Sequence, residues 1–305
     1  MKHVHPLPTM LTLGNFGCGF LAIVLAARSL MGESLPIRPF GEVTGMELLL
    51  IACYCVFLAM IFDMLDGKIA RLTDSASRFG GEMDSLADVV SFGIAPAVIF
   101  SVSRMFVAPL PRHWWSLSIV FGLVYASCAC LRLARYNVEM GAVAKDYFYG
   151  LPSPAAAGAV TSLFLLIQEA GLDPETHYTV GIKTVYALAI YMLFIGLLMV
   201  TRVRYPHVTN LLLYGRKRFT HFVIALFVLL LLYYYPAYLL LIAFNGYVLW
   251  GLGWEAIRKL PVRWRPGKAW RSRANASLTD PLESDTDAPG EADFDRDELA
   301  AEEAE

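Results

Sequence analysis

Long apolar segments dominate this chain and limit the folds that it can adopt. Eight segments are each about 17 to 25 residues long, the length at which a helix crosses the roughly 30 Å hydrocarbon core of a bilayer. They cover residues 9–28, 47–66, 84–103, 115–133, 154–170, 184–201, 219–235 and 237–256. Because 57% of the residues are hydrophobic, a soluble domain does not fit. The sequence predicts an all-α, polytopic integral membrane bundle.

The last two apolar segments leave three arrangements open. Only the turn at Pro236 separates residues 219–235 from residues 237–256. They are two crossing helices, one broken helix, or a hairpin that does not cross fully. In each case we expect a transmembrane domain over residues 1–259.

The distribution of positive charge predicts how the bundle is oriented. Cytoplasmic connections of membrane proteins carry an excess of Lys and Arg. Here basic residues gather after the second, fourth and sixth segments, at Lys68, Arg71, Arg78, Arg132, Arg135, Lys145, Arg202, Arg204, Arg216, Lys217 and Arg218. The alternate connections carry fewer, at Arg28, Arg38, Arg104, Arg112 and Lys183. Both chain termini are therefore expected in the cytoplasm, as in a bacterial-type cytoplasmic membrane.

The C-terminal part of the chain differs from the rest in composition. Residues 274–305 contain twelve acidic residues, one basic residue and few large apolar side chains, which predicts a disordered tail. Residues 1–273 carry a net charge of +9, whereas the whole chain carries −2. Residues 260–273 are rich in arginine and tryptophan. Next to a membrane helix, such a segment favours binding to anionic lipid headgroups over binding to nucleic acid.

Four aspartates lie where the second and third apolar segments meet. Asp63 and Asp66 are three residues apart, and Asp84 and Asp88 are four apart, so each pair shares one face of a helix. A carboxylate at the edge of the hydrocarbon is usually paired, bound to metal or functional, because removing it from water is costly. Two such faces together supply the oxygen ligands that hard divalent cations prefer. Beside them, Gly67 lets a ligand approach the backbone.

These residues form a pattern that resembles a known family. The string Asp63-x2-Asp66-Gly67-x2-Ala70-Arg71-x8-Gly80-x3-Asp84-x3-Asp88 is similar to the signature of the CDP-alcohol phosphatidyltransferases. The resemblance implies a membrane enzyme with a six-helix core, here extended by two helices, that forms a homodimer and uses two Mg²⁺ or Mn²⁺ ions. In such enzymes an alcohol displaces CMP from a CDP-linked lipid.

The same resemblance assigns roles to the residues of the signature. It implies that Asp63, Asp66, Asp84 and Asp88 bind the metals and that Asp88 also accepts the proton of the alcohol. It places Gly67, Ala70, Arg71, Ser77 and Gly80 at the CDP-lipid.

Flanking segments are similar to the phosphatidylserine synthase branch of that family. They are residues 11–15, 85–96, 131–137, 150–154 and 203–205. The branch implies CDP-diacylglycerol and L-serine as substrates. We expect Arg135 to bind the serine carboxylate, with Arg132 and Asn137 as further candidates; ordinary anchoring at the membrane surface is the competing role of both arginines. Asn15 either contacts the nucleotide or bridges two helices.

Two other functions compete with serine transfer. The same chemistry can act on another alcohol, such as glycerol 3-phosphate or an inositol phosphate, but an acceptor phosphate should require additional clustered cations. A cation or proton transporter is the alternative from another class. Transporters place such carboxylates near the bilayer midplane, whereas these aspartates gather at one edge.

Overall fold

The computed structural model describes a helical bundle. It covers residues 6–30, 35–37, 41–73, 77–107, 112–139, 148–169, 178–205 and 218–259. The helices are α1 (Pro6–Ser29), α2 (Gly45–Leu72), α3 (Arg78–Asp88), α4 (Ala95–Val107), α5 (Arg112–Glu139), α6 (Ser153–Glu169), α7 (Tyr178–Val200), α9 (Arg218–Tyr234) and α10 (Pro236–Lys259). A π-helical segment, η1 (Val89–Ile94), joins α3 to α4. The predicted all-α class is confirmed.

Two pairs of short antiparallel strands lie in the connections between helices. Strand β1 (Leu35–Ile37) pairs with β2 (Gly41–Val43). Strand β3 (Phe148–Tyr149) pairs with β4 (Arg204–Tyr205). The expected segments at residues 260–273 and 274–305 lie outside the described residues.

Six helical segments of the described chain are long and apolar enough to cross a membrane. They are Leu7–Ser29, Gly45–Leu72, Phe79–Val102, Leu117–Val138, Lys183–Val200 and Pro236–Arg258. Every segment expected from the sequence coincides with helix, but α6 and α9 have only 17 residues each. The chain is therefore a multi-pass membrane protein, while the count of eight crossings stays a prediction.

The ends of the helices differ from the prediction near the aspartates. Helix α2 continues to Leu72 and α3 begins at Arg78, so Lys68 and Arg71 are helical instead of lying in a connection. Arg132 and Arg135 likewise belong to α5. The apolar pattern ends where a helix leaves the hydrocarbon, but Lys and Arg favour helix and prolong it. The residues of the signature consequently stand on helices.

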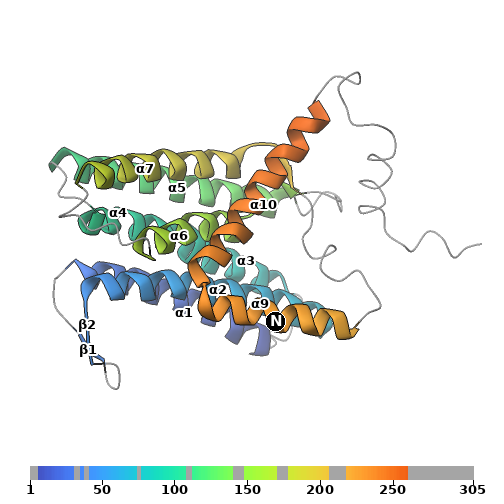
Figure 1. Cartoon of the computed structure of the whole chain (residues 1–305). Coiled ribbons are helices and arrows are strands. Elements are labelled where there is room, and N and C mark those ends of the chain that lie inside the picture. Colours follow the sequence, from blue (N-terminus) through green and yellow to red (C-terminus); the bar gives the residue numbers. More distant parts are fainter. Residues whose placement is uncertain are drawn as a thin grey trace, which may run out of the picture. The chain divides into compact units, whose positions relative to one another are not determined.

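Helix α1 packs along α2 and also touches α3 and η1. A Cβ at Gly14 of α1 would lie 3.0 Å from the Phe62 ring on α2, so the two helices pack closely there. Figure 1 shows α5 and α7 side by side, and α10 lying obliquely across α6; both pairs are in contact. Helices α2 and α3, which carry the aspartates, thus both pack on α1, and α5 packs on η1 directly after α3.

A tight turn at Gly150 fixes the start of α6. Gly150 has a φ of 84°, a conformation that residues with a Cβ adopt reluctantly. Its N–H donates a 2.8 Å hydrogen bond to the Val203 carbonyl just beyond α7. A Cβ at this position would also press against the Met199 carbonyl. The turn anchors the chain to the end of α7 just before Ser153.

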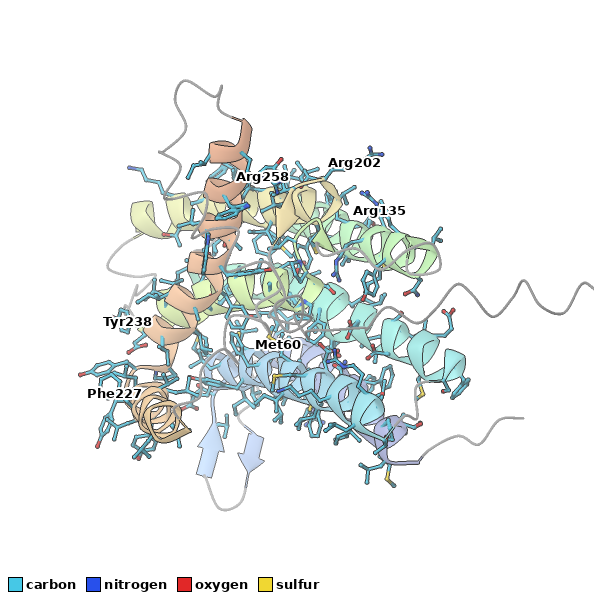
Figure 2. All side chains as sticks on the ribbon, turned by 90° about the vertical axis from the view of Figure 1, so that its right-hand side faces the viewer. Met60, Arg135, Arg202, Phe227, Tyr238 and Arg258 are labelled. Atoms are coloured by element: carbon cyan, nitrogen blue, oxygen red, sulfur yellow. The ribbon has the colours of Figure 1, made fainter. Side chains whose placement is uncertain are left out.

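Helix α10 is held to the bundle by a polar network, while α9 exposes much of its apolar surface. The Tyr191 hydroxyl donates to Asn245 Oδ1, and Asn245 Nδ2 donates to the Ser162 hydroxyl at 3.3 Å. Polar side chains within a bilayer have no water to bind, and hydrogen bonds between helices satisfy them instead. Figure 2 shows Phe227 of α9 and Tyr238 of α10 on the outer side of these helices, and both side chains are exposed. Exposed apolar side chains there are suited to contact lipid.

Candidate active site

Three aspartates from two helices form the centre of the site. Asp63 and Asp66 stand on α2 and Asp84 on α3, and one carboxylate oxygen of each lies within 4.8 Å of the others. Asp66 is 4% exposed, and the other two are partly buried. Asp63 and Asp66 share one face of α2 because they are three residues apart. Both α2 and α3 pack on α1, and this packing brings Asp84 to the same place.

Two oxygens of this group are left without a partner. Asp66 Oδ2 and Asp84 Oδ1 are buried and accept no hydrogen bond from the described residues. A buried acceptor without a donor is costly, and carboxylates that converge also repel one another. A divalent cation would satisfy both oxygens and offset the repulsion. The donor set therefore fits the Mg²⁺ or Mn²⁺ that the sequence predicts.

Asp88 lies one turn beyond Asp84 and has a different partner. It is 7% exposed, and its Oδ1 accepts a 3.0 Å hydrogen bond from Asn15 Nδ2 of α1. It also interacts electrostatically with Asp63 and Asp84. Asp88 thus borders the three-aspartate group without belonging to it, and Asn15 bridges α1 and α3. The metal-binding role of Asp88 stays a prediction.

Arg132 brings a positive charge to the aspartates. Its Nη1 donates a 2.6 Å hydrogen bond to the Ser153 hydroxyl at the start of α6. Its guanidinium lies 5.8 Å from the centre of the Tyr136 ring. It interacts electrostatically with Asp88 and Asp63. A positively charged side chain on α5 is therefore close enough to feel the carboxylates of both α2 and α3.

The other two residues expected at the serine lie further along α5. The Asn137 amide is hydrogen-bonded to the Ser85 hydroxyl at 3.0 Å, which ties the end of α5 to α3 beside Asp84. Figure 2 shows Arg135 toward the same end of the bundle as Arg202, which follows α7. Thus Arg132 and Asn137 each have a hydrogen-bond partner near the aspartates, and Arg135 lies three residues beyond Arg132 on the same helix.

The residues expected at the CDP-lipid fall into two groups. A Cβ at Gly67 would meet no atom within 4 Å among the described residues, so the backbone there is open to a ligand. The exposed Arg71 donates through Nε to the Gly67 carbonyl at 3.0 Å, and Ala70 is partly exposed beside it. Ser77 instead caps α3, because its hydroxyl accepts a 3.0 Å hydrogen bond from the Gly80 N–H.

Three polar residues at the site were not expected from the sequence. Ser153 binds Arg132, Ser85 binds Asn137, and Thr12 lies near the Asp66 carboxylate. Thr12 is 5% exposed and its hydroxyl donates to the Pro8 carbonyl. A serine or threonine in an apolar helix is common, so only its neighbours in space reveal its role. Of the three, only Ser85 could have been suspected from the sequence, because it directly follows Asp84.

Comparison with known proteins agrees with this arrangement. Residues 5–201 match the family model described as CDP-alcohol phosphatidyltransferase. A protein from Helicobacter pylori named CDP-diacylglycerol–serine O-phosphatidyltransferase is 33% identical over 204 residues, which cover 66% of this chain and 78% of that protein. One of the same name from Mycobacterium tuberculosis is 42% identical over 118 residues, 37% of this chain and 39% of that protein.

A third relative comes from an archaeon. The archaetidylserine synthase of Methanothermobacter thermautotrophicus is 31% identical over 208 residues, which cover 67% of this chain and 71% of that protein. The matched region contains all four aspartates, Arg132 and the turn at Gly150. Signature, site geometry and family model agree, and the chain belongs to the CDP-alcohol phosphatidyltransferase family.

Proposed function

We propose that this protein transfers the phosphatidyl group of CDP-diacylglycerol to the hydroxyl of L-serine, which gives phosphatidylserine and CMP. The observation that carries this proposal is the group of Asp63, Asp66 and Asp84, in which two buried oxygens have no partner among the described residues. The guanidinium of Arg132 interacts electrostatically with Asp63 of this group. The relatives support serine as the acceptor, since two are named serine O-phosphatidyltransferases and the third is named archaetidylserine synthase.

The three grouped aspartates are the proposed ligands of two divalent ions, with Asp88 as a shared fourth ligand. Bound Mg²⁺ or Mn²⁺ would neutralise the diphosphate oxygens and the charge that develops on departing CMP. The chain's own contribution is to hold the carboxylates of α2 and α3 close enough together to share the ions. Burial of Asp66 Oδ2 and Asp84 Oδ1 would also limit competition from water for these two oxygens.

Asp88 is the proposed proton acceptor. The serine oxygen attacks the phosphorus that carries diacylglycerol, and its proton passes to Asp88. A new P–O bond forms to serine while the P–O bond to CMP breaks, so CMP leaves with the bonding electron pair. Asp88 borders the other three aspartates and is held by Asn15, which suits a group that must meet the alcohol beside the metals.

Arg132 is the residue that we propose for the serine carboxylate. Its guanidinium is planar and can bind a carboxylate through two parallel hydrogen bonds. It already interacts electrostatically with the carboxylates of Asp63 and Asp88. A serine held there would place its hydroxyl toward Asp88. Asn137 is a further candidate for serine contact, and Arg135, which the sequence favours for the carboxylate, is the competing candidate.

The remaining assignments complete the proposal. Gly67, Ala70 and Arg71 are proposed to contact the CDP-lipid, with Ser77 and Gly80 shaping the start of α3. The excess of basic residues at and beyond the C-terminal ends of α2, α5 and α7 supports a cytoplasmic active site and cytoplasmic termini. A homodimer, a lipid-binding segment at 260–273 and a disordered tail at 274–305 remain part of the proposal.

An acceptor panel tests this function. Purified protein in detergent receives CDP-diacylglycerol, Mg²⁺ or Mn²⁺, and one alcohol at a time: L-serine, ethanolamine, glycerol 3-phosphate or inositol phosphate. We expect serine to give the fastest CMP release and a lipid product with the mass of phosphatidylserine. Faster release with a phosphorylated alcohol would assign the protein to another branch of its family.

A further inference from the structure

We propose that Asn15 is a positioning residue that fixes the orientation of Asp88, and that it does not bind substrate. The inference rests on the proposed function, in which Asp88 accepts the proton of the alcohol. Asn15 Nδ2 donates a 3.0 Å hydrogen bond to Asp88 Oδ1, and Asn15 is 0% exposed. Asn15 Oδ1, the other polar atom of the amide, is also buried and accepts no hydrogen bond from the described residues. The bond to Asp88 is therefore the contact through which we expect the amide to act on the reaction.

The bond selects one oxygen of the Asp88 carboxylate for the reaction. A carboxylate on a helix can rotate about its terminal torsion, which has a broad energy profile. A donor fixed on Oδ1 restricts that rotation and leaves Oδ2 as the oxygen that can take a proton. Asp88 therefore presents one oxygen in one direction, as a general base must when its alcohol is held elsewhere.

The backbone of Asn15 is itself fixed by the helix that carries Asp88. Ser91, three residues beyond Asp88, donates a 2.9 Å hydrogen bond through its hydroxyl to the Asn15 carbonyl. One turn along α1, a Cβ at Gly19 would lie 2.7 Å from Ser91 Cα, so only glycine allows this approach. Side chain, main chain and close packing thus hold Asn15 against one short segment.

That segment has unusual helical geometry. Asp88 is the last residue of α3, and the π-helix η1 starts at the next residue. π-Helical turns inside α-helices are rare and are frequently found at functional sites. The hydrogen bond from Ser91 to Asn15 comes from within this turn. The wide turn directly after the proposed base therefore forms part of the support for Asp88.

The first test removes the amide and measures catalysis and binding separately. Asn15→Leu keeps the branched shape of the side chain but removes the donor. A hydrogen bond to a charged group contributes enough that its loss should lower kcat about tenfold or more. The KM for CDP-diacylglycerol should stay within about twofold of the wild-type value. The rise in Tm that CDP-diacylglycerol causes in the absence of serine should differ from that of the wild type by no more than about a degree or two. Ser29→Ala, which removes another buried polar group of α1, should leave kcat unchanged.

A double-mutant cycle decides whether Asn15 acts through Asp88. Asp88→Asn alone should lower kcat at least about 10²-fold. Adding Asn15→Leu to Asp88→Asn should then cause little further loss, because the residue that Asn15 orients has already lost its function. A full additional tenfold loss in the double variant would overturn the proposal, and so would wild-type kcat in Asn15→Leu. Wild-type kcat in Asp88→Asn would overturn the proposed general base instead, so the two failures are distinguishable.

A pair of glycine variants tests the same geometry without replacing a polar residue. Gly19→Ala should push α1 away from Ser91, separate Asn15 from Asp88 and lower kcat with little change in the KM for CDP-diacylglycerol. Gly17→Ala on the same helix is the control, since a Cβ there meets no described atom within 4 Å. Unchanged kcat in a folded Gly19→Ala protein would contradict the inference.

Discussion

The guanidinium of Arg132 donates a 2.6 Å hydrogen bond to the hydroxyl of Ser153, and this bond joins the end of α5 to the start of α6. Because Ser153 follows the turn at Gly150, which is anchored on the end of α7, three helices determine where the Arg132 charge lies. That charge interacts with Asp63 and Asp88 on two further helices. The site thus depends on residues that are far apart in the sequence.

Arg132→Lys should raise the KM for serine at least about tenfold, because a single point charge replaces a planar group that binds a carboxylate at two points. The KM for CDP-diacylglycerol should change little. Ethanolamine lacks the carboxylate, so its use should fall no more than about twofold. Steady-state CMP release with each substrate varied gives all three values.

Arg135→Lys is the matched control for that measurement. If Arg135 only anchors the end of α5 at the membrane surface, the serine KM and kcat of the Arg135→Lys variant should match those of the wild type. A rise in the serine KM in Arg135→Lys, with normal values in Arg132→Lys, would assign the carboxylate to Arg135.

Gly67→Ala should impair binding of the CDP-lipid without harming the fold. The new Cβ meets no described atom within 4 Å, and alanine favours helix, so Tm should stay the same or rise. If CDP-diacylglycerol approaches the backbone at this position, its KM should rise about tenfold or more. Gly81→Ala is the control, because its Cβ also meets no described atom within 4 Å and Gly81 is not a fixed position of the signature. Equal kinetics in both variants would remove Gly67 from the lipid site.

Much of the fold was predictable, because apolar segments long enough to cross a bilayer have few alternatives to helix. The ends of the helices were not. Helix α2 runs on to Leu72 and α3 starts at Arg78, since polar residues that favour helix continue it beyond the apolar pattern. The π-helical turn after Asp88 was also missed, because hydrophobic periodicity does not record a local change of hydrogen-bond register.

The candidate site was predictable in its residues more than in their contacts. The spacing of the aspartates indicated shared helix faces, and Asp63, Asp66 and Asp84 do converge. Nothing in the spacing indicated that Asp88 is bonded to Asn15, 73 positions away. The choice between Arg132 and Arg135 likewise depends on how α5 is rotated against α6. Such contacts between distant segments follow from tertiary packing, which one sequence does not encode in local patterns.

Gly150→Ala should destabilise the protein and weaken the site. The turn has a φ of 84°, and a Cβ would press on the Met199 carbonyl, so a cost of about 1–2 kcal/mol or more is expected. For a protein of this size, that cost corresponds to a Tm lower by several degrees, on the order of 4 °C. Gly246→Ala in α10, where a Cβ meets nothing within 4 Å, should not lower Tm. A Tm for Gly150→Ala as high as that of Gly246→Ala would refute the role of this turn.

Deletion of residues 274–305 should leave Tm and serine turnover nearly unchanged in detergent. The segment has twelve acidic residues and few large apolar ones, so it is not expected to contribute to a packed core. Thermal unfolding and CMP release of the shortened and full-length proteins give the comparison. A large loss of either property would mean that the acidic segment packs against the enzyme.

The central claim is that the aspartates of α2 and α3 hold the divalent ions with which the protein transfers a phosphatidyl group to serine. The most direct measurement is a Mn²⁺ titration of chelator-treated full-length protein, in which electron paramagnetic resonance reports free Mn²⁺ and a parallel assay reports CMP released with serine. We expect no turnover without metal, about two ions bound per chain at saturation, and turnover that rises with occupancy. Asp66→Asn and Asp84→Asn should weaken binding and turnover together. Full turnover in the chelated protein, or Mn²⁺ binding unaffected by both substitutions, would contradict the claim.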